Sequence, residues 1–341
     1  MTSISNQQST INNRQSSINL STNVCGIKLS NPTILPAGFL GTTNNILKRV
    51  ADNGAGAVTI KSISCDPREG HKNPTVITFE AGMLNAVGYS NPGVKEAAKE
   101  FATMNKIGVP VIASIIGTTA DDFLKVIDGF GELLSGKNDQ SSTRNPQSAI
   151  RNPNGFAAVE LPLSCPHTPG FGTLAGQSSP EATFKIVSSV RQKIKLPLFV
   201  KLSPNVSNIG DLAKVAEDAG ADGITAINTM GPGMIINIEA RKPVLDFKVG
   251  GVSGAALRPI AVKCVYDIYK SVKIPIIGVG GISTGRHAIE MMMAGASAVG
   301  IGTAIHDRGV DVFKKVCDEM ESWMSEHGFD NIKDIIGAAH E

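Results

Sequence analysis

Cys165 is the residue whose type and position most directly suggest chemistry. It lies in V-E-L-P-L-S-C-P-H-T-P-G-F-G at residues 159–172, where an apolar run gives way to prolines and glycines. Such a run predicts a buried strand that ends in an ordered loop, which would present the thiol at the end of the strand. The thiolate is the reactive form of cysteine. We therefore predict that Cys165 takes part in a reaction.

Two lysines end other apolar runs. Lys61 follows A-V-T-I, and Lys201 follows L-F-V. A lysine at the end of an apolar strand is costly to bury unless its ammonium group meets an anion. The alternative is that both side chains extend into solvent from the strand ends. We predict that both lysines face an anionic ligand.

Two glycine-rich runs lie near the end of the chain. They read I-I-G-V-G-G at residues 276–281 and A-V-G-I-G-T-A at residues 298–304. Each leaves a predicted strand and approaches a predicted helix, where exposed backbone N–H groups bind phosphate. Glycines can also serve only to make tight turns, but two such runs in succession favour a phosphate site. The chain has no early G-x-G-x-x-G run of the dinucleotide-binding type.

Short apolar runs alternate with longer stretches compatible with helices from residue 24 onward. The predicted strands cover residues 34–37, 57–61, 110–115, 157–161, 198–202, 223–228, 274–279 and 298–301. The predicted helices cover residues 44–53, 93–107, 120–134, 180–194, 208–219, 255–272, 285–294 and 307–327. This alternation predicts a parallel sheet with crossover helices.

The predicted fold class is α/β, with a single (β/α)₈ TIM barrel. Continuous apolar strands suit a sheet buried on both faces, and a barrel places its chemistry at the carboxyl ends of its strands. A doubly wound open sheet is the alternative architecture. The polar residues 1–21 are predicted to form a flexible tail, and the barrel is predicted to span residues 22–341 with a surface insertion at residues 135–155.

The composition excludes several classes of protein. The 341 residues are 42% hydrophobic, and 32 basic residues nearly balance 30 acidic ones without a basic stripe, so nucleic acid and anionic membranes are not expected as partners. No apolar run is long enough to span a bilayer, and the N-terminus has no apolar signal-peptide core. Five widely spaced cysteines disfavour a disulfide framework or a metal site and favour a cytoplasmic location.

From residue 24 onward the sequence resembles the class 1 dihydroorotate dehydrogenases, and within them the catalytic subunit of class 1B. The resemblance covers about nine tenths of the chain. It implies a (β/α)₈ barrel that holds one FMN and oxidises dihydroorotate to orotate in pyrimidine synthesis. The matching motifs, besides the two glycine runs, are N-P-T-I-L-P-A-G at 31–38, G-M-L-N-A-V-G-Y-S-N-P-G at 82–93, S-C-P at 164–166, V-K-L-S-P-N-V at 200–206, A-I-N-T at 226–229 and G-G-V-S-G at 250–254.

The resemblance also implies a set of site residues. Cys165 would be the base that removes a proton from C5 of dihydroorotate while C6 passes a hydride to N5 of FMN. Lys201 would lie near the N1/O2 edge of the flavin ring, and Lys61 would contact both FMN and the substrate carboxylate. The implied substrate contacts are Lys61, Asn85, Ala86, Val87, Gly88, Tyr89, Asn228 and Thr229. The implied FMN contacts are Gly38, Lys61, Ser62, Ser114, Lys201, Ile227, Gly254, Gly280, Gly281, Gly302 and Thr303, and no metal site is implied.

Three residues depart from the family pattern. Pro162, His167 and Ser114 each stand where the family usually has asparagine. Proline has no N–H to donate, whereas a histidine can replace an amide donor. S-C-P-H also resembles the pyrimidine-reducing domain of dihydropyrimidine dehydrogenases, which leaves that activity as one alternative, although the run at residues 82–93 favours dihydroorotate. A barrel that binds a phosphorylated ligand without redox chemistry is a second alternative.

The chain carries no second redox centre of its own. It has no nicotinamide fingerprint and no cysteine cluster for an iron–sulfur centre. The resemblance to class 1B implies a partner subunit that carries FAD and a [2Fe–2S] cluster, with NAD⁺ as the final acceptor. A homodimeric core is expected, either alone or within a heterotetramer with that subunit. The class 1A alternative is a homodimer that uses fumarate.

Overall fold

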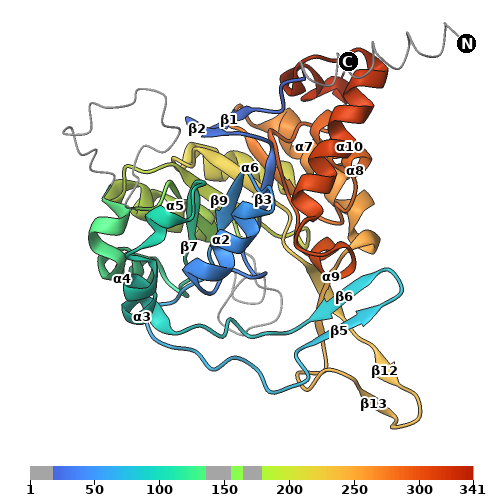
Figure 1. Ribbon diagram of the computed structural model, residues 1–341. Coiled ribbons are helices and arrows are strands. Elements are labelled where there is room, and N and C mark those ends of the chain that lie inside the picture. Colours follow the sequence, from blue (N-terminus) through green and yellow to red (C-terminus); the bar gives the residue numbers. More distant parts are fainter. Residues whose placement is uncertain (1–17, 136–154, 164–178, 341) are drawn as a thin grey trace, which may run out of the picture.

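The computed structural model describes residues 18–135, 155–163 and 179–340. Eight parallel strands close into a barrel in the order β10-β15-β16-β3-β4-β7-β8-β9 (Figure 1). The predicted (β/α)₈ barrel is therefore confirmed, and each predicted strand overlaps one of the eight. Their bounds are β3 (Thr33–Leu35), β4 (Ala57–Thr59), β7 (Val111–Ser114), β8 (Ala158–Pro162), β9 (Leu198–Leu202), β10 (Gly223–Ala226), β15 (Ile276–Val279) and β16 (Ala298–Gly300).

Helices surround the barrel and pack against it through the main apolar core. Several begin at a side-chain cap, which satisfies backbone N–H groups that the helix itself leaves free. Thr119 and Asp122 form a capping box at the start of α4, and Ser179 caps α5. The helices are α2 (Asn44–Asp52), α3 (Gly93–Phe101), α4 (Ala120–Phe130), α5 (Pro180–Lys193), α6 (Ile209–Asp218), α7 (Arg258–Ser271), α8 (Gly285–Met293), α9 (Ala304–Arg308) and α10 (Val312–His327).

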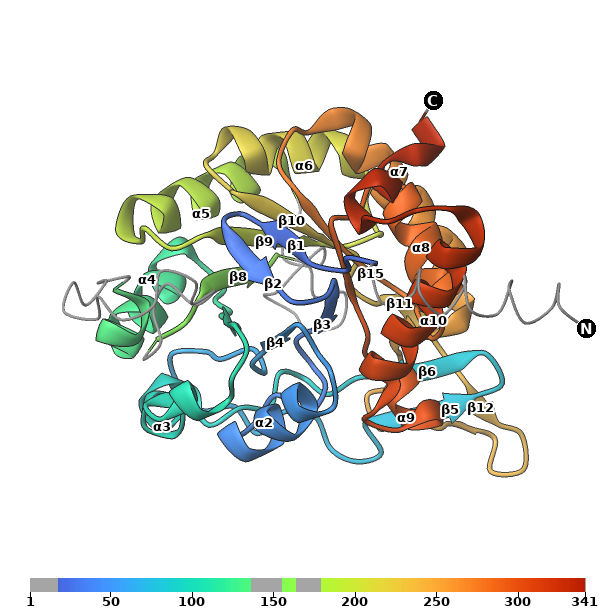
Figure 2. The same cartoon turned by 45° about the horizontal axis from the view of Figure 1, so that its top comes forward.

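The interior of the barrel is filled at its amino end by a separate apolar cluster. The antiparallel pair β1 (Thr22–Val24) and β2 (Ile27–Leu29) contributes to this cluster and lies across that end of the barrel (Figure 2). Ligands are therefore expected at the opposite, carboxyl end. The buried members are Val24, Ile27, Leu29, Ile34, Ala57, Ile112, Ala158, Phe199, Ile277 and Ala298.

A second sheet lies at the carboxyl end and was not predicted. Its four strands are ordered β11-β14-β6-β5, and a small hairpin of β12 (Ile236–Asn237) and β13 (Lys242–Pro243) extends beyond it (Figure 1). The strands are β5 (Val76–Phe79), β6 (Gly82–Asn85), β11 (Met230–Gly233) and β14 (Gly250–Ser253). The sheet therefore contains the first residues of the run at 82–93, up to the predicted substrate contact Asn85, and most of the G-G-V-S-G run.

Two predicted helices differ from the structure. The helix predicted at residues 307–327 is two helices, because Gly309 has a φ of 80° and separates α9 from α10. The helix predicted at residues 93–107 ends at Phe101, and a short 3₁₀ turn follows at Met104–Lys106. Glycine reaches this left-handed conformation without the steric cost other residues meet, which explains the first break.

Part of the predicted tail is described. Asn19 forms a bridge with Asn331, and Leu20 is buried in the main core. The rest of the tail and most of the predicted insertion lie outside the described residues, so the division into a tail and one barrel domain stays a prediction. Among the helices that the structure describes, none is long and apolar enough to cross a membrane.

Candidate active site

Two adjoining cavities occupy the carboxyl end of the barrel. Their volumes are about 350 Å³ and 280 Å³. The second sheet forms part of the wall of each, since residues of β5 and β6 line both. Three polar residues that follow or belong to barrel strands, Lys201, Asn228 and Thr229, also line both. The two cavities therefore form one continuous site with Lys201 in the shared wall.

The larger cavity is lined by the two glycine-rich turns. Among the described residues, the backbone N–H groups of Gly281, Ile282, Gly302 and Thr303 donate to no protein acceptor. Backbone N–H groups gathered in this way are the donors that bind phosphate. The predicted cofactor residues that line this cavity are Lys201, Ile227, Gly254, Gly280, Gly281, Gly302 and Thr303.

Packing also demands glycine in the first of these turns. Gly281 has a φ of 68°, and a Cβ there would lie 2.6 Å from the Cβ of Arg258 and 2.7 Å from the carbonyl oxygen of Gly254. Any larger residue would displace the turn from the cavity wall. The glycines thus serve packing as well as ligand access, and the two readings of the sequence do not exclude each other.

The smaller cavity holds most of the residues predicted to bind substrate. Lys61 lines it, and among the described residues its ammonium group has no hydrogen-bond or ion-pair partner. Burial lowers the pKa of Lys61 from its ordinary value, because it removes water from the charged form. An anion bound beside it would offset that loss. The other predicted residues that line this cavity are Gly38, Ser62, Asn85, Val87, Gly88, Tyr89, Lys201, Asn228 and Thr229.

Two predicted residues do not line either cavity. Ala86 is 1% exposed and packs in a small apolar cluster with Leu84 and Leu245. Ser114 is fully buried, and its hydroxyl lies 2.9 Å from that of Ser62, which does line the smaller cavity. Ser114 therefore reaches the site through Ser62.

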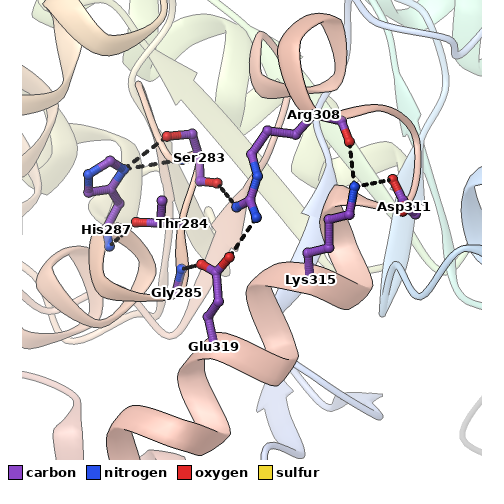
Figure 3. A network of polar contacts seen from close by, with 8 residues as sticks. All are labelled: Ser283, Thr284, Gly285, His287, Arg308, Asp311, Lys315 and Glu319. Carbon is purple, nitrogen blue, oxygen red and sulfur yellow. Dashed lines mark hydrogen bonds and ion pairs between the residues drawn. The ribbon is translucent and has the colours of Figure 1, made fainter.

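A network at the edge of the larger cavity, whose lining includes Ser283, joins the segments that follow the two glycine turns (Figure 3). Arg308 at the end of α9 donates to the carbonyl of Ser283 and, at 2.6 Å, to Glu319 on α10. Glu319 also accepts the N–H of Gly285 at 2.6 Å, where α8 begins. Burial acts to raise the pKa of Glu319, but the bonds from Arg308 and Gly285 outweigh it and lower that pKa. The carboxylate therefore stays charged and holds the two segments together.

Cys165 and His167 lie outside the described residues, so their roles stay predictions. Pro162, the last residue of β8, lines the smaller cavity, which places the start of the cysteine segment at the site. Burial raises the pKa of Cys25 to about 12, that of Cys264 to about 11 and that of Cys317 to about 12. These three thiols are not poised to react.

Several residues of the site were missed by the sequence reasoning. Ser253 lines both cavities and accepts a hydrogen bond of 2.9 Å from Thr303. The sequence feature that could have identified Ser253 is its place in the glycine-rich run G-G-V-S-G. Phe39 and Met83 also line both cavities. Glu160 is 3% exposed and lies beside Lys201, but a single acid within an apolar run carries no pattern that would have assigned it.

The chain is similar to known proteins of a single family. The family model described as dihydroorotate dehydrogenase matches residues 19–139 and 143–324. A protein of Methanocaldococcus jannaschii is 43% identical over 326 residues, which are 94% of this chain and 98% of that protein. Proteins of Methanothermobacter thermautotrophicus and Pyrococcus abyssi are 41% and 40% identical, over 94% of this chain and 99% of each. All three are named dihydroorotate dehydrogenase B (NAD(+)), catalytic subunit.

Proposed function

The chain belongs to the dihydroorotate dehydrogenase family, and we propose that it is the FMN-containing catalytic subunit that oxidises dihydroorotate to orotate in UMP synthesis. The observation that carries this proposal is the continuous site at the carboxyl end of the barrel. One part offers backbone N–H groups for a phosphate, and the other offers the ammonium group of Lys61 for a carboxylate.

The residues of the larger cavity fit FMN. Its phosphate would be held by the N–H groups of the two glycine turns, and Lys201 would face its ring from the shared wall. The side chains of Ile227, Ser62 and Thr303 complete the proposed contacts, with Ser114 supporting Ser62. Bound FMN supplies the acceptor for the hydride that leaves C6 of the substrate.

The residues of the smaller cavity would bind and orient dihydroorotate. Lys61 would bind the carboxylate, while the side chains of Asn85, Asn228 and Thr229 would hydrogen-bond the pyrimidine ring. The loop from Val87 to Tyr89 would cover it. Cys165 would remove the proton from C5, and for this it must be in its thiolate form or reach that form at the pH of the reaction.

We expect Lys61→Met to weaken orotate binding about tenfold or more, because a hydrogen bond to a charged group contributes roughly 1.5–3 kcal/mol. Titration of the flavin spectrum with orotate measures this affinity.

The affinity for orotate should also depend on pH. Burial lowers the pKa of Lys61, so the affinity of the unaltered protein should fall as the pH rises toward that pKa, and this fall should occur at a lower pH than the titration of a free lysine. The variant should lack this fall. Lys48→Met, at an exposed lysine of α2, is the control. Equal affinity in Lys61→Met would remove the lysine from the substrate site.

Substrate choice separates this function from reduction of uncharged pyrimidines. Dihydrouracil lacks the carboxylate that Lys61 is proposed to bind. In anaerobic mixing, dihydroorotate should bleach the flavin and dihydrouracil should do so far more slowly. Faster bleaching by dihydrouracil would favour the dihydropyrimidine dehydrogenase alternative.

The relatives are named as catalytic subunits, and we propose a partner for this chain too. The partner would carry FAD and a [2Fe–2S] cluster and pass electrons to NAD⁺, around a homodimeric core in the cytoplasm. Five exposed apolar side chains on and beside the second sheet form what we call the apolar rim: Val76, Met230, Met234, Ile236 and Ile238. One of the five, Val76, also lines the smaller cavity, so the rim reaches the active site at that residue, and we propose that the electron-transfer subunit docks there.

A further inference from the structure

A polar layer lies inside the barrel between the apolar cluster and the cavities. Ser114, Glu160 and Lys201 follow the cluster residues Ile112, Ala158 and Phe199 by two positions. Side chains two positions apart on a strand face the same side of the sheet, so these three also point into the barrel. Barrel interiors are usually filled by branched apolar side chains. Charged groups at this level therefore call for an explanation.

Glu160 and Lys201 form a buried ion pair in this layer. The distance from Lys201 Nζ to Glu160 Oε1 is 4.0 Å, and the two side chains are 7% and 4% exposed. Lys201 lines both cavities, whereas Glu160 lines neither. Among the described residues, Glu160 Oε1 accepts no hydrogen bond. Burying such a pair costs desolvation free energy that apolar residues would avoid, so stability alone does not account for it.

We propose that Glu160 is a positioning residue that holds the ammonium group of Lys201 at the floor of both cavities and offsets its charge at the flavin. The inference rests on the proposed function, since it takes FMN as the ligand. The register partners of Lys201 on the neighbouring strands are Pro162 and Thr225, and neither side chain carries a charge. The Glu160 carboxylate, 4.0 Å from the ammonium group, places a negative charge directly beside the lysine.

The sign of the effect follows from the charge of Glu160. Replacing the carboxylate with an amide removes a negative charge 4.0 Å from the ammonium group of Lys201, so less of the lysine's positive charge is offset at the flavin. Reduced FMN bound as proposed would carry negative charge near Lys201, so the loss of the carboxylate would favour the reduced form. Glu160 therefore keeps the FMN reduction potential lower than Lys201 alone would set it.

The test is the FMN midpoint potential of Glu160→Gln, measured by anaerobic titration with a reference dye. We expect the balance of reduced over oxidised flavin to rise at least about tenfold, which is ~30 mV for a two-electron couple. Asp128→Asn removes an exposed carboxylate from α4, which lines neither cavity, and should leave the midpoint unchanged. An unchanged or lower midpoint in Glu160→Gln overturns the proposal.

Two further variants keep the test decisive. In the Lys201→Gln background, the additional change Glu160→Gln should shift the midpoint less than it does alone, because it acts partly through the lysine; strictly additive shifts overturn that role. Should Glu160→Gln not fold, Glu160→Asp retains the charge one methylene further away and should raise the midpoint by a smaller amount. Wild-type protein that binds no FMN would defeat the proposed function, whereas flavin bleached normally by dihydroorotate with no shift in Glu160→Gln defeats this inference alone.

Discussion

Cys165→Ala should retain FMN but undergo flavin reduction by dihydroorotate at least ~10²-fold more slowly, the lower end of the cost of losing a general base. Removal of the C5 proton needs a basic group within reach of that carbon, and the variant has none at this position. Anaerobic stopped-flow measurement of flavin bleaching at saturating dihydroorotate gives the rate. Unchanged flavin occupancy shows that the loss concerns chemistry and not folding.

A matched control uses another cysteine of the chain. Cys264 lies on α7, and its raised pKa of about 11 keeps it protonated at neutral pH. Cys264→Ala should bleach at close to the unaltered rate. A normal rate of flavin bleaching in Cys165→Ala would exclude the Cys165 thiol as the base.

The isolated chain should reduce artificial dyes with dihydroorotate but show essentially no NAD⁺ reduction until an FAD and iron–sulfur subunit is added. The reason is that the sequence has no early G-x-G-x-x-G run of the dinucleotide-binding type. Steady-state assays with dye, fumarate and NAD⁺ separate the possibilities. Efficient NAD⁺ reduction by the chain alone contradicts the proposed partner, and rapid turnover with fumarate by a homodimer would indicate the class 1A mode.

The proposed docking surface has its own variant. Ile238 is 78% exposed in the apolar rim, and Ile238→Asp should abolish the stimulation by the partner while leaving dye reduction intact. Ile260→Asp places the same charge on α7 at a residue that is 36% exposed and outside the rim. If the partner subunit stimulated NAD⁺ reduction equally in both variants, it would not dock on the apolar rim.

The barrel could be predicted because each of its strands is a short apolar run and each crossover is long enough for a helix. The second sheet could not be predicted in the same way. Its strands are four residues long and those of the adjoining hairpin are two. Strand β14 pairs with β6 across a separation of 166 residues, as in Gly251 opposite Asn85. Such pairing depends on where the barrel brings the loops together, and local pattern does not record this.

Some residues of the candidate site could likewise be predicted from the local sequence, and others could not. Lys61 and Lys201 were predictable because a charged residue at the end of an apolar strand needs a partner. The pairing of Lys201 with Glu160 was not, since it depends on the register between β8 and β9, in which Pro162 and not Glu160 lies opposite the lysine. Ala86 was assigned to the substrate by resemblance, but its backbone bond to Thr75 and its apolar neighbours place its side chain away from both cavities.

Anaerobic titration of the purified protein with dihydroorotate, following both the visible flavin absorbance and the orotate formed, tests the proposed oxidation at the bound flavin. We expect a yellow protein in which each bound FMN is bleached by one dihydroorotate with the appearance of one orotate. A colourless protein that cannot be reconstituted with FMN, or a bound flavin that stays oxidised in excess dihydroorotate, would contradict it.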